Sequence, residues 1–124
     1  EMSDHYRAAT SCYHGKFLPK IDQEWVIVAR EKYHLAFMTA AFELGNLYIK
    51  AGKYTLALAI ANRALEEDNY NEAFHRSAML AYSALDDRPS VARQFEKCRK
   101  ILKKELDIEP SSQTITLYNS LMQH

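Results

Sequence analysis

Five histidines and two cysteines are the side chains best suited to bind a metal ion. These residues are His5, His14, His34, His75, His124, Cys12 and Cys98. A closed zinc site needs four ligands, which are often supplied as closely spaced Cys or His pairs. No Cys-x-x-Cys or His-x-x-x-His pair occurs, and Cys12-x-His14 has no second half. We therefore expect no metal site and no cofactor, and we interpret His75 as a structural residue of a helix face.

Sequence motifs for phosphate binding and for nucleophilic catalysis are also missing. The chain has neither a glycine-rich phosphate loop nor a Gly-x-Ser-x-Gly elbow. Because nothing in the sequence requires an enzyme, we predict a non-catalytic protein. A fragment of an enzyme is a rival interpretation, and a catalytic motif elsewhere in the full gene would support it.

Basic residues recur along one predicted helix at spacings of three and four residues. They are Arg93, Lys97, Lys100 and Lys104. Such a stripe could contact DNA phosphates, but it usually marks a solvated helix face, and the pair Glu96 and Lys100 at i,i+4 favours that interpretation. Sixteen basic residues also balance sixteen acidic ones. We therefore favour the solvated face, and we expect this chain alone to bind DNA weakly and without sequence preference.

Length and composition predict one cytoplasmic domain. Of the 124 residues, 48% are apolar, which is enough for one continuous core over residues 1–124. No apolar run is long enough for a membrane span and no signal peptide pattern is present, so we expect no membrane partner. We expect Cys12 and Cys98 to be reduced thiols, with a disulfide between them as the alternative. A start at Glu1 without Met suggests a piece of a longer chain.

The backbone pattern is helical throughout. The chain has only three Gly and three Pro residues, and no strand-like alternation interrupts the helical spacing, so we predict an all-α fold. Helices are expected over about 3–13, 23–51, 54–67, 72–85 and 89–106, with a last helix capped by Ser111 or Ser112. Asp22 is the expected cap of the second helix, and Pro89 suits the first turn of the fifth. Val91, Phe95, Cys98, Leu102 and Leu106 form the expected buried face of that fifth helix.

An internal repeat organises these helices. Leu44, Gly45, Tyr48, Ala57, Ala61 and Ala64 fall opposite Ala78, Met79, Tyr82, Val91, Phe95 and Cys98 at a spacing of 34 residues without a gap. This is the period of a tetratricopeptide repeat. It predicts antiparallel helix pairs that form a right-handed superhelical stack. Because such stacks offer an extended surface, they usually bind other macromolecules.

The first helices of the two repeats are expected to line a partner-binding groove. Its candidate residues are Phe42, Asn46, Ile49, Lys50, Arg76, Leu80 and Ser83. Asn46 stands where some peptide-binding repeats hold an Asn that grips a C-terminal carboxylate. Phe42 replaces the companion Lys of that motif, so we expect no carboxylate clamp. In the alternative interpretation, Phe42 and Leu80 pack on the terminal helices of this same chain.

Six short motifs, in a fixed order, carry a resemblance to a known family. They are Tyr13-x-Gly15-x-Phe17-Leu18-Pro19, Trp25 with Arg30 and Glu31, Ala51-Gly52-x-Tyr54-x-x-Ala57, Glu72-x-x-His75-Arg76-x-x-Met79, Leu102-x-x-Glu105-Leu106-x-x-Glu109-Pro110 and Thr116-Leu117-Tyr118. Together they resemble the bacterial transcriptional activator domain, over nearly the whole chain. Two turns depart from the family pattern: Asn69 stands where a Pro is common, and residues 86–88 lack the usual Gly.

The resemblance implies a regulatory role. The family occurs in bacterial transcription regulators, among them the antibiotic regulatory proteins of actinomycetes, usually after a winged-helix DNA-binding domain. It implies a tetratricopeptide-like module that supports dimerisation or contacts the transcription machinery or the regulator's other domains. DNA would then be reached only through a domain absent from this chain. A general tetratricopeptide scaffold, which binds a peptide or protein outside transcription, is the alternative.

Overall fold

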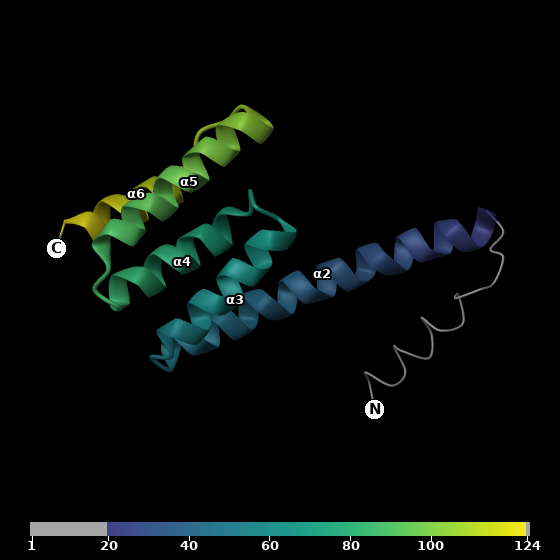
Figure 1. Cartoon of the computed structure of the whole chain (residues 1–124), viewed down its shortest axis with the longest axis horizontal. Coiled ribbons are helices and arrows are strands. Elements are labelled where there is room, and N and C mark those ends of the chain that lie inside the picture. The colour runs from purple at the N-terminus through teal and green to yellow at the C-terminus, as the bar shows by residue number, and fades with distance from the viewer. Residues whose placement is uncertain (1–19, 124) are drawn as a thin grey trace. The chain divides into compact units, whose positions relative to one another are not determined.

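The computed structural model describes residues 20–123 of the chain. These residues form the helices α2 (Lys20–Lys50), α3 (Tyr54–Glu67), α4 (Glu72–Ala84), α5 (Arg88–Leu106) and α6 (Ser112–Met122) (Figure 1). No strand occurs within residues 20–123, so the predicted all-α fold is confirmed. The helix expected over about 3–13, together with Cys12, His5, His14 and His124, lies outside the described residues.

The chain divides into two compact units, Glu1–Ala36 and Phe37–His124. Helix α2 runs from the first unit into the second. In the described part of the first unit, α2 exposes Trp25, Tyr33 and Leu35. The single domain over residues 1–124 stays a prediction, and so does the right-handed superhelix.

Turn chemistry accounts for most helix boundaries. The side chains of Asn71, Asp87 and Ser111 accept hydrogen bonds from the free backbone N–H groups at the starts of α4, α5 and α6, as N-cap residues do. Ser111, rather than Ser112, is therefore the cap of the last helix. Asp22 is not a cap, because α2 begins two residues earlier, at Lys20.

Left-handed backbone conformations separate the helices. Gly52 has φ 76° in the turn after α2, as expected for a helix stop. The turn between α4 and α5 lacks a Gly, and Asp86 adopts φ 62° there instead. Asp is one of the few other residues that tolerates this conformation.

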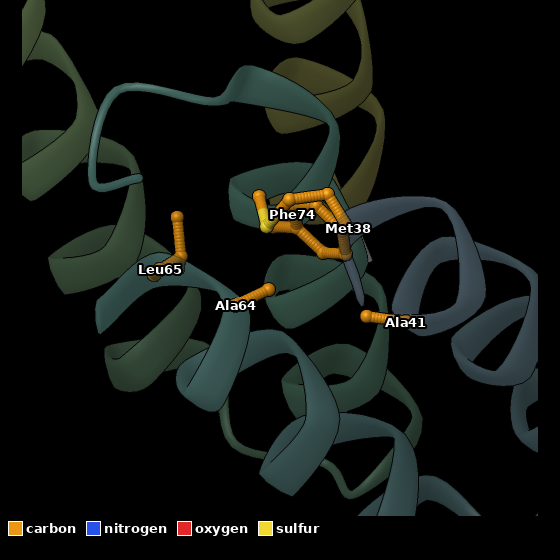
Figure 2. Packing of buried hydrophobic residues seen from close by; sticks show 5 residues of the cluster. All are labelled: Met38, Ala41, Ala64, Leu65 and Phe74. Carbon is orange, nitrogen blue, oxygen red and sulfur yellow. The ribbon is translucent and has the colours of Figure 1, made fainter. Parts of the chain in front are cut away.

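The core of the second unit forms where α2, α3 and α4 meet. Its buried cluster consists of Met38, Ala41, Ala64, Leu65 and Phe74, with Phe37 and Ile60 packed against it. Figure 2 shows the five buried side chains gathered between the three helices. Ala57, Ala61 and Ala64 of α3 are at most 1% exposed. These narrow side chains let α3 approach its neighbours closely, as the repeat pattern predicts.

A second buried layer joins α4 to α5. It contains Met79 of α4 together with Val91, Cys98 and Leu102 of α5. Helix α4 also packs on α3, and α6 packs on both α4 and α5 (Figure 1). The predicted burial of Leu106 is wrong: it is 47% exposed, because it lies in the last turn of α5, just before the chain turns away at Asp107 with φ 55°.

Candidate functional site

The predicted groove residues of α2 follow one stripe of the second unit. At 100° per residue, Phe42, Asn46 and Ile49 fall on the same side of the helix. Phe42 is 44% exposed, while Asn46 and Ile49 are half-buried and Lys50 is exposed. This stripe offers one aromatic side chain, one amide and one ammonium group to a partner.

Phe42 is also anchored on the core. Its ring meets the ring of Phe74 edge to face, with the ring centres 6.3 Å apart and the planes at 88°. Phe74 is buried. Phe42 therefore has one edge in contact with the core, while much of the ring remains open to solvent.

Helix α4 leaves only a narrow strip for a partner. Phe74, His75, Ser77, Ala78, Met79 and Ala81 are all buried. Arg76, Leu80 and Ser83 share one side of the helix by their spacing. Leu80 is 38% exposed, whereas Arg76 and Ser83 are half-buried. The four groove residues of α2 and the three of α4 thus form two stripes, which we call the α2 stripe and the α4 stripe.

Arg76 takes part in a hydrogen-bonded cluster that sequence analysis missed. Its Nη1 donates to Oγ1 of Thr114 at 2.9 Å, and that hydroxyl donates to the Glu72 carboxylate at 2.6 Å. The same carboxylate oxygen accepts from the backbone N–H of Ser111 at 2.9 Å and from its hydroxyl at 3.1 Å. We call these four residues the Glu72 cluster. It fastens the first turn of α6 to α4, and Thr114 at its centre is fully buried.

The Glu72 cluster favours an ionised carboxylate. Partial burial opposes ionisation, but the hydrogen bonds from Thr114 and Ser111 outweigh it and lower the pKa of Glu72. The only sequence signal was the spacing of Glu72 and Arg76 at i,i+4 within one family motif. Their partners on α6 lie about forty residues further along the chain, beyond the reach of any local pattern.

A second polar cluster surrounds the fully buried His75. Its Nε2 lies 2.7 Å from the backbone oxygen of Asn69, and its Nδ1 lies 2.7 Å from Nε2 of Gln94. A carbonyl can only accept, so Nε2 carries the proton and Nδ1 accepts from the Gln94 amide. Burial is the main reason that the pKa of His75 is lowered. The neutral ring is thus fully hydrogen-bonded, and His75 joins α4 to α5 and to the preceding turn.

The basic residues of α5 lie on its outer side. Arg93, Lys97, Lys100 and Lys104 are all exposed, whereas Val91, Cys98 and Leu102 on the opposite side are buried. Nη2 of Arg93 donates to the Ser90 hydroxyl at 2.9 Å. Within residues 20–123, the three lysines form no ion pair. We call the four residues the basic stripe.

Neither a metal site nor a membrane span is found in the part of the chain that the structure describes. No group of three His, Cys, Asp or Glu side chains there could hold a metal ion. No described helix is long and apolar enough to cross a bilayer. The surface features described above are the two groove stripes and the basic stripe.

Comparison with known proteins identifies the family. No curated protein and no solved structure matches the chain. The sequence model of the bacterial transcriptional activator domain matches residues 1–122, and the helical fold agrees with the tetratricopeptide-like architecture that the resemblance implies. The match covers Glu72 and His75, two motif residues of the resemblance whose hydrogen bonds join α4 to its neighbours. The chain belongs to the bacterial transcriptional activator domain family, whose members are regulatory domains associated with transcription activation.

Proposed function

We propose that this chain is a non-catalytic, protein-binding domain of a cytoplasmic bacterial transcription regulator, and that the α2 and α4 stripes form its partner surface. The partner is another protein surface: a second copy of the chain, another domain of the regulator, or the transcription machinery. DNA sequence is read by a separate domain that this chain does not contain. Family membership supports the regulatory role.

The observation that carries the proposal is the exposure of apolar side chains on the first helices of both repeats. Phe42 is 44% exposed and Leu80 is 38% exposed, although each lies beside buried neighbours. Protein interfaces depend on a few aromatic and apolar anchors at their centre, surrounded by polar groups. Asn46, Lys50 and Ser83 supply such polar groups along the same two stripes.

The anchors differ in how much they also stabilise the fold. Phe42 touches Phe74. An edge-to-face pair stabilises a protein by about 0.5 to 1.5 kcal/mol beyond the free energy gained by burying the ring surface. We therefore expect Phe42→Ala to lower the free energy of unfolding by about 1 to 2 kcal/mol. A loss of about 3 kcal/mol or more would be that of a core ring. Leu80→Ser is a cleaner test of binding than Phe42→Ala, because it does not remove the contact between Phe42 and the buried ring of Phe74.

A binding experiment with a matched control tests the proposal. Leu80→Ser is compared with Leu56→Ser, which removes a side chain 46% exposed on α3, a helix that carries neither stripe. Self-association is measured by sedimentation, and binding to purified bacterial RNA polymerase by surface plasmon resonance. We expect Leu80→Ser to weaken at least one interaction about tenfold or more, the effect of losing an interface anchor, while Leu56→Ser leaves it unchanged. Equal effects of both variants would refute the α4 stripe as partner surface. No interaction of the unmodified chain in either assay would exclude a second copy and RNA polymerase as the partner.

A further inference from the structure

The basic stripe of α5 is a surface that the protein-binding proposal does not use. Its four residues are spaced by four, three and four positions, so at 100° per residue they fall within about 60° of one another around the helix. All four are exposed. The stripe extends over twelve residues, about 16 Å from the first to the last at a rise of 1.5 Å per residue.

The positive charge of the stripe is only partly offset by its neighbours on α5, among them Glu96, whose carboxylate interacts electrostatically with Lys100. The Glu96 carboxylate beside it is hydrogen-bonded to Arg99, and Asp107 forms an ion pair with Lys103 at 2.9 Å. Asp87 lies near Arg93 and offsets part of its charge. Lys97, Lys100 and Lys104 have no ion-pair partner within residues 20–123, so their ammonium groups remain available to an anion.

We propose that the basic stripe contacts the phosphate backbone of duplex DNA. Each of the four basic side chains can neutralise one phosphate, so the stripe can supply up to four phosphate contacts. A row of exposed cations without base-reading side chains suits such a contact, which gives position and affinity but no sequence selectivity. The choice of DNA over other polyanions rests on the proposed function, because a regulator bound at its promoter holds its domains beside the duplex.

A neutral net charge is compatible with this local contact. The chain has sixteen basic and sixteen acidic residues, so its overall field does not attract DNA and the isolated chain binds weakly. When the domain is tethered beside a DNA-reading domain, the second contact becomes intramolecular, and a weak contact then adds usefully to affinity. The stripe would thus assist a regulator that is already bound.

Fluorescence anisotropy with a labelled duplex of about 20 base pairs of arbitrary sequence, at about 20 to 150 mM salt, tests the proposal. The test variant is Lys97→Gln, Lys100→Gln and Lys104→Gln combined. The control combines Arg30→Gln, Lys32→Gln and Lys53→Gln, three exposed positions on other parts of the chain. Both variants remove the same charge, so a difference between them reports position rather than net charge. Circular dichroism checks that both remain helical.

The salt dependence gives a quantitative expectation. Four phosphate contacts predict a slope of about −3.6 for log K against log salt concentration, and loss of three contacts reduces it to about −0.9. At about 50 mM salt we expect the test variant to bind about tenfold or more weaker. The control variant should keep the steep slope. The Leu80→Ser variant should also keep it, so failure of the groove proposal and failure of this one are distinguishable.

Three outcomes would overturn the proposal. The first is an equal loss of DNA binding in the test and control variants, which would indicate net charge alone. The second is no measurable binding of the unmodified chain even at the lowest salt concentration. The third is binding to poly-L-glutamate that depends on the stripe while the duplex does not compete, which would assign the stripe to an acidic protein.

Discussion

Helix α4 carries two polar clusters that join it to neighbouring helices, and the two clusters use different chemical groups. The His75 cluster is fully buried and uses neutral groups: an imidazole, an amide and a backbone carbonyl. The Glu72 cluster lies nearer the surface and uses ionised groups around the buried hydroxyl of Thr114. Burying a charge is costly, whereas a buried neutral group needs only its hydrogen-bond partners. The degree of burial of each cluster therefore determines whether neutral or ionised groups join the helices there.

Replacing His75 should have the largest effect. His75→Ala leaves a cavity in the core and removes the partners of the Gln94 amide and the Asn69 carbonyl, so we expect unfolding free energy to fall by about 3 to 5 kcal/mol. Urea denaturation measures this loss. Gln94→Leu keeps volume but leaves Nδ1 of His75 without a donor, which should cost about 1 to 3 kcal/mol. If both variants cost less than about 1 kcal/mol, the His75 cluster is not a structural element of the core.

Removing the hydroxyl of Thr114 should have a smaller effect. Thr114→Val preserves shape but breaks the link between Arg76 and Glu72, and hydrogen bonds to charged groups are worth about 1.5 to 3 kcal/mol. Thr116→Val, at an exposed position two residues along the same helix, is the matched control. Hydrogen exchange should show faster opening of α6 in Thr114→Val only. Faster exchange throughout α3 and α4 instead would mean that the Glu72 cluster supports the whole fold.

The two clusters should respond to acid in separate pH ranges. The folded-state pKa of His75 is lowered from its ordinary 6.5, so the unfolded chain takes up the proton first and stability falls as pH drops below about 6.5. Glu72 also has a lowered pKa, from 4.5. Its contribution is present above about 4.5 and is lost as pH falls through the folded-state value.

Urea denaturation of the unmodified chain and of His75→Gln, compared between pH 7.5 and 5, measures the contribution of His75 separately from that of Glu72. A single proton contributes a slope of at most about 1.4 kcal/mol per pH unit. We expect the unmodified chain to lose stability more steeply over this interval than His75→Gln does. Parallel profiles would show that His75 takes up its proton equally well in both states.

Replacing Arg76 should change stability least. It should also show whether Arg76 binds a partner or only fastens α6 to α4. Arg76→Gln removes one hydrogen bond at a half-buried position, so we expect a loss of about 0.5 to 1.5 kcal/mol. In the binding assay, a loss of affinity beyond that of Thr114→Val would assign Arg76 to the partner surface. Equal losses would mean that Arg76 acts only through α6.

Local sequence patterns predicted the helices well, but they predicted the contacts between helices less well. The bounds of α3, the narrow stripe of Ala57, Ala61 and Ala64, and Pro89 in the first turn of α5 depend on spacing and backbone chemistry within a few residues. They could therefore be read from the sequence. The start of α2 and the burial of Leu106 were predicted wrongly, because helix ends depend on where the chain turns and on what packs there.

The polar clusters could not have been predicted in the same way. Gln94 is a polar residue near the buried side of α5, and only the three-dimensional position of His75 explains it. Thr114 likewise meets Glu72 across 42 residues of sequence. The groove residues remain a prediction: the structure gives their exposure, but partner binding depends on a second molecule.

The buried thiol of Cys98 links the redox chemistry of this domain to its folding equilibrium. Burial raises the pKa of Cys98 to about 12, so at neutral pH the folded protein holds very little of the thiolate, which is the form that oxidants and alkylating agents attack. The side chain is also fully buried on the inner side of α5. Modification of this thiol therefore requires the packing around α5 to open, and the rate of modification measures how often it does.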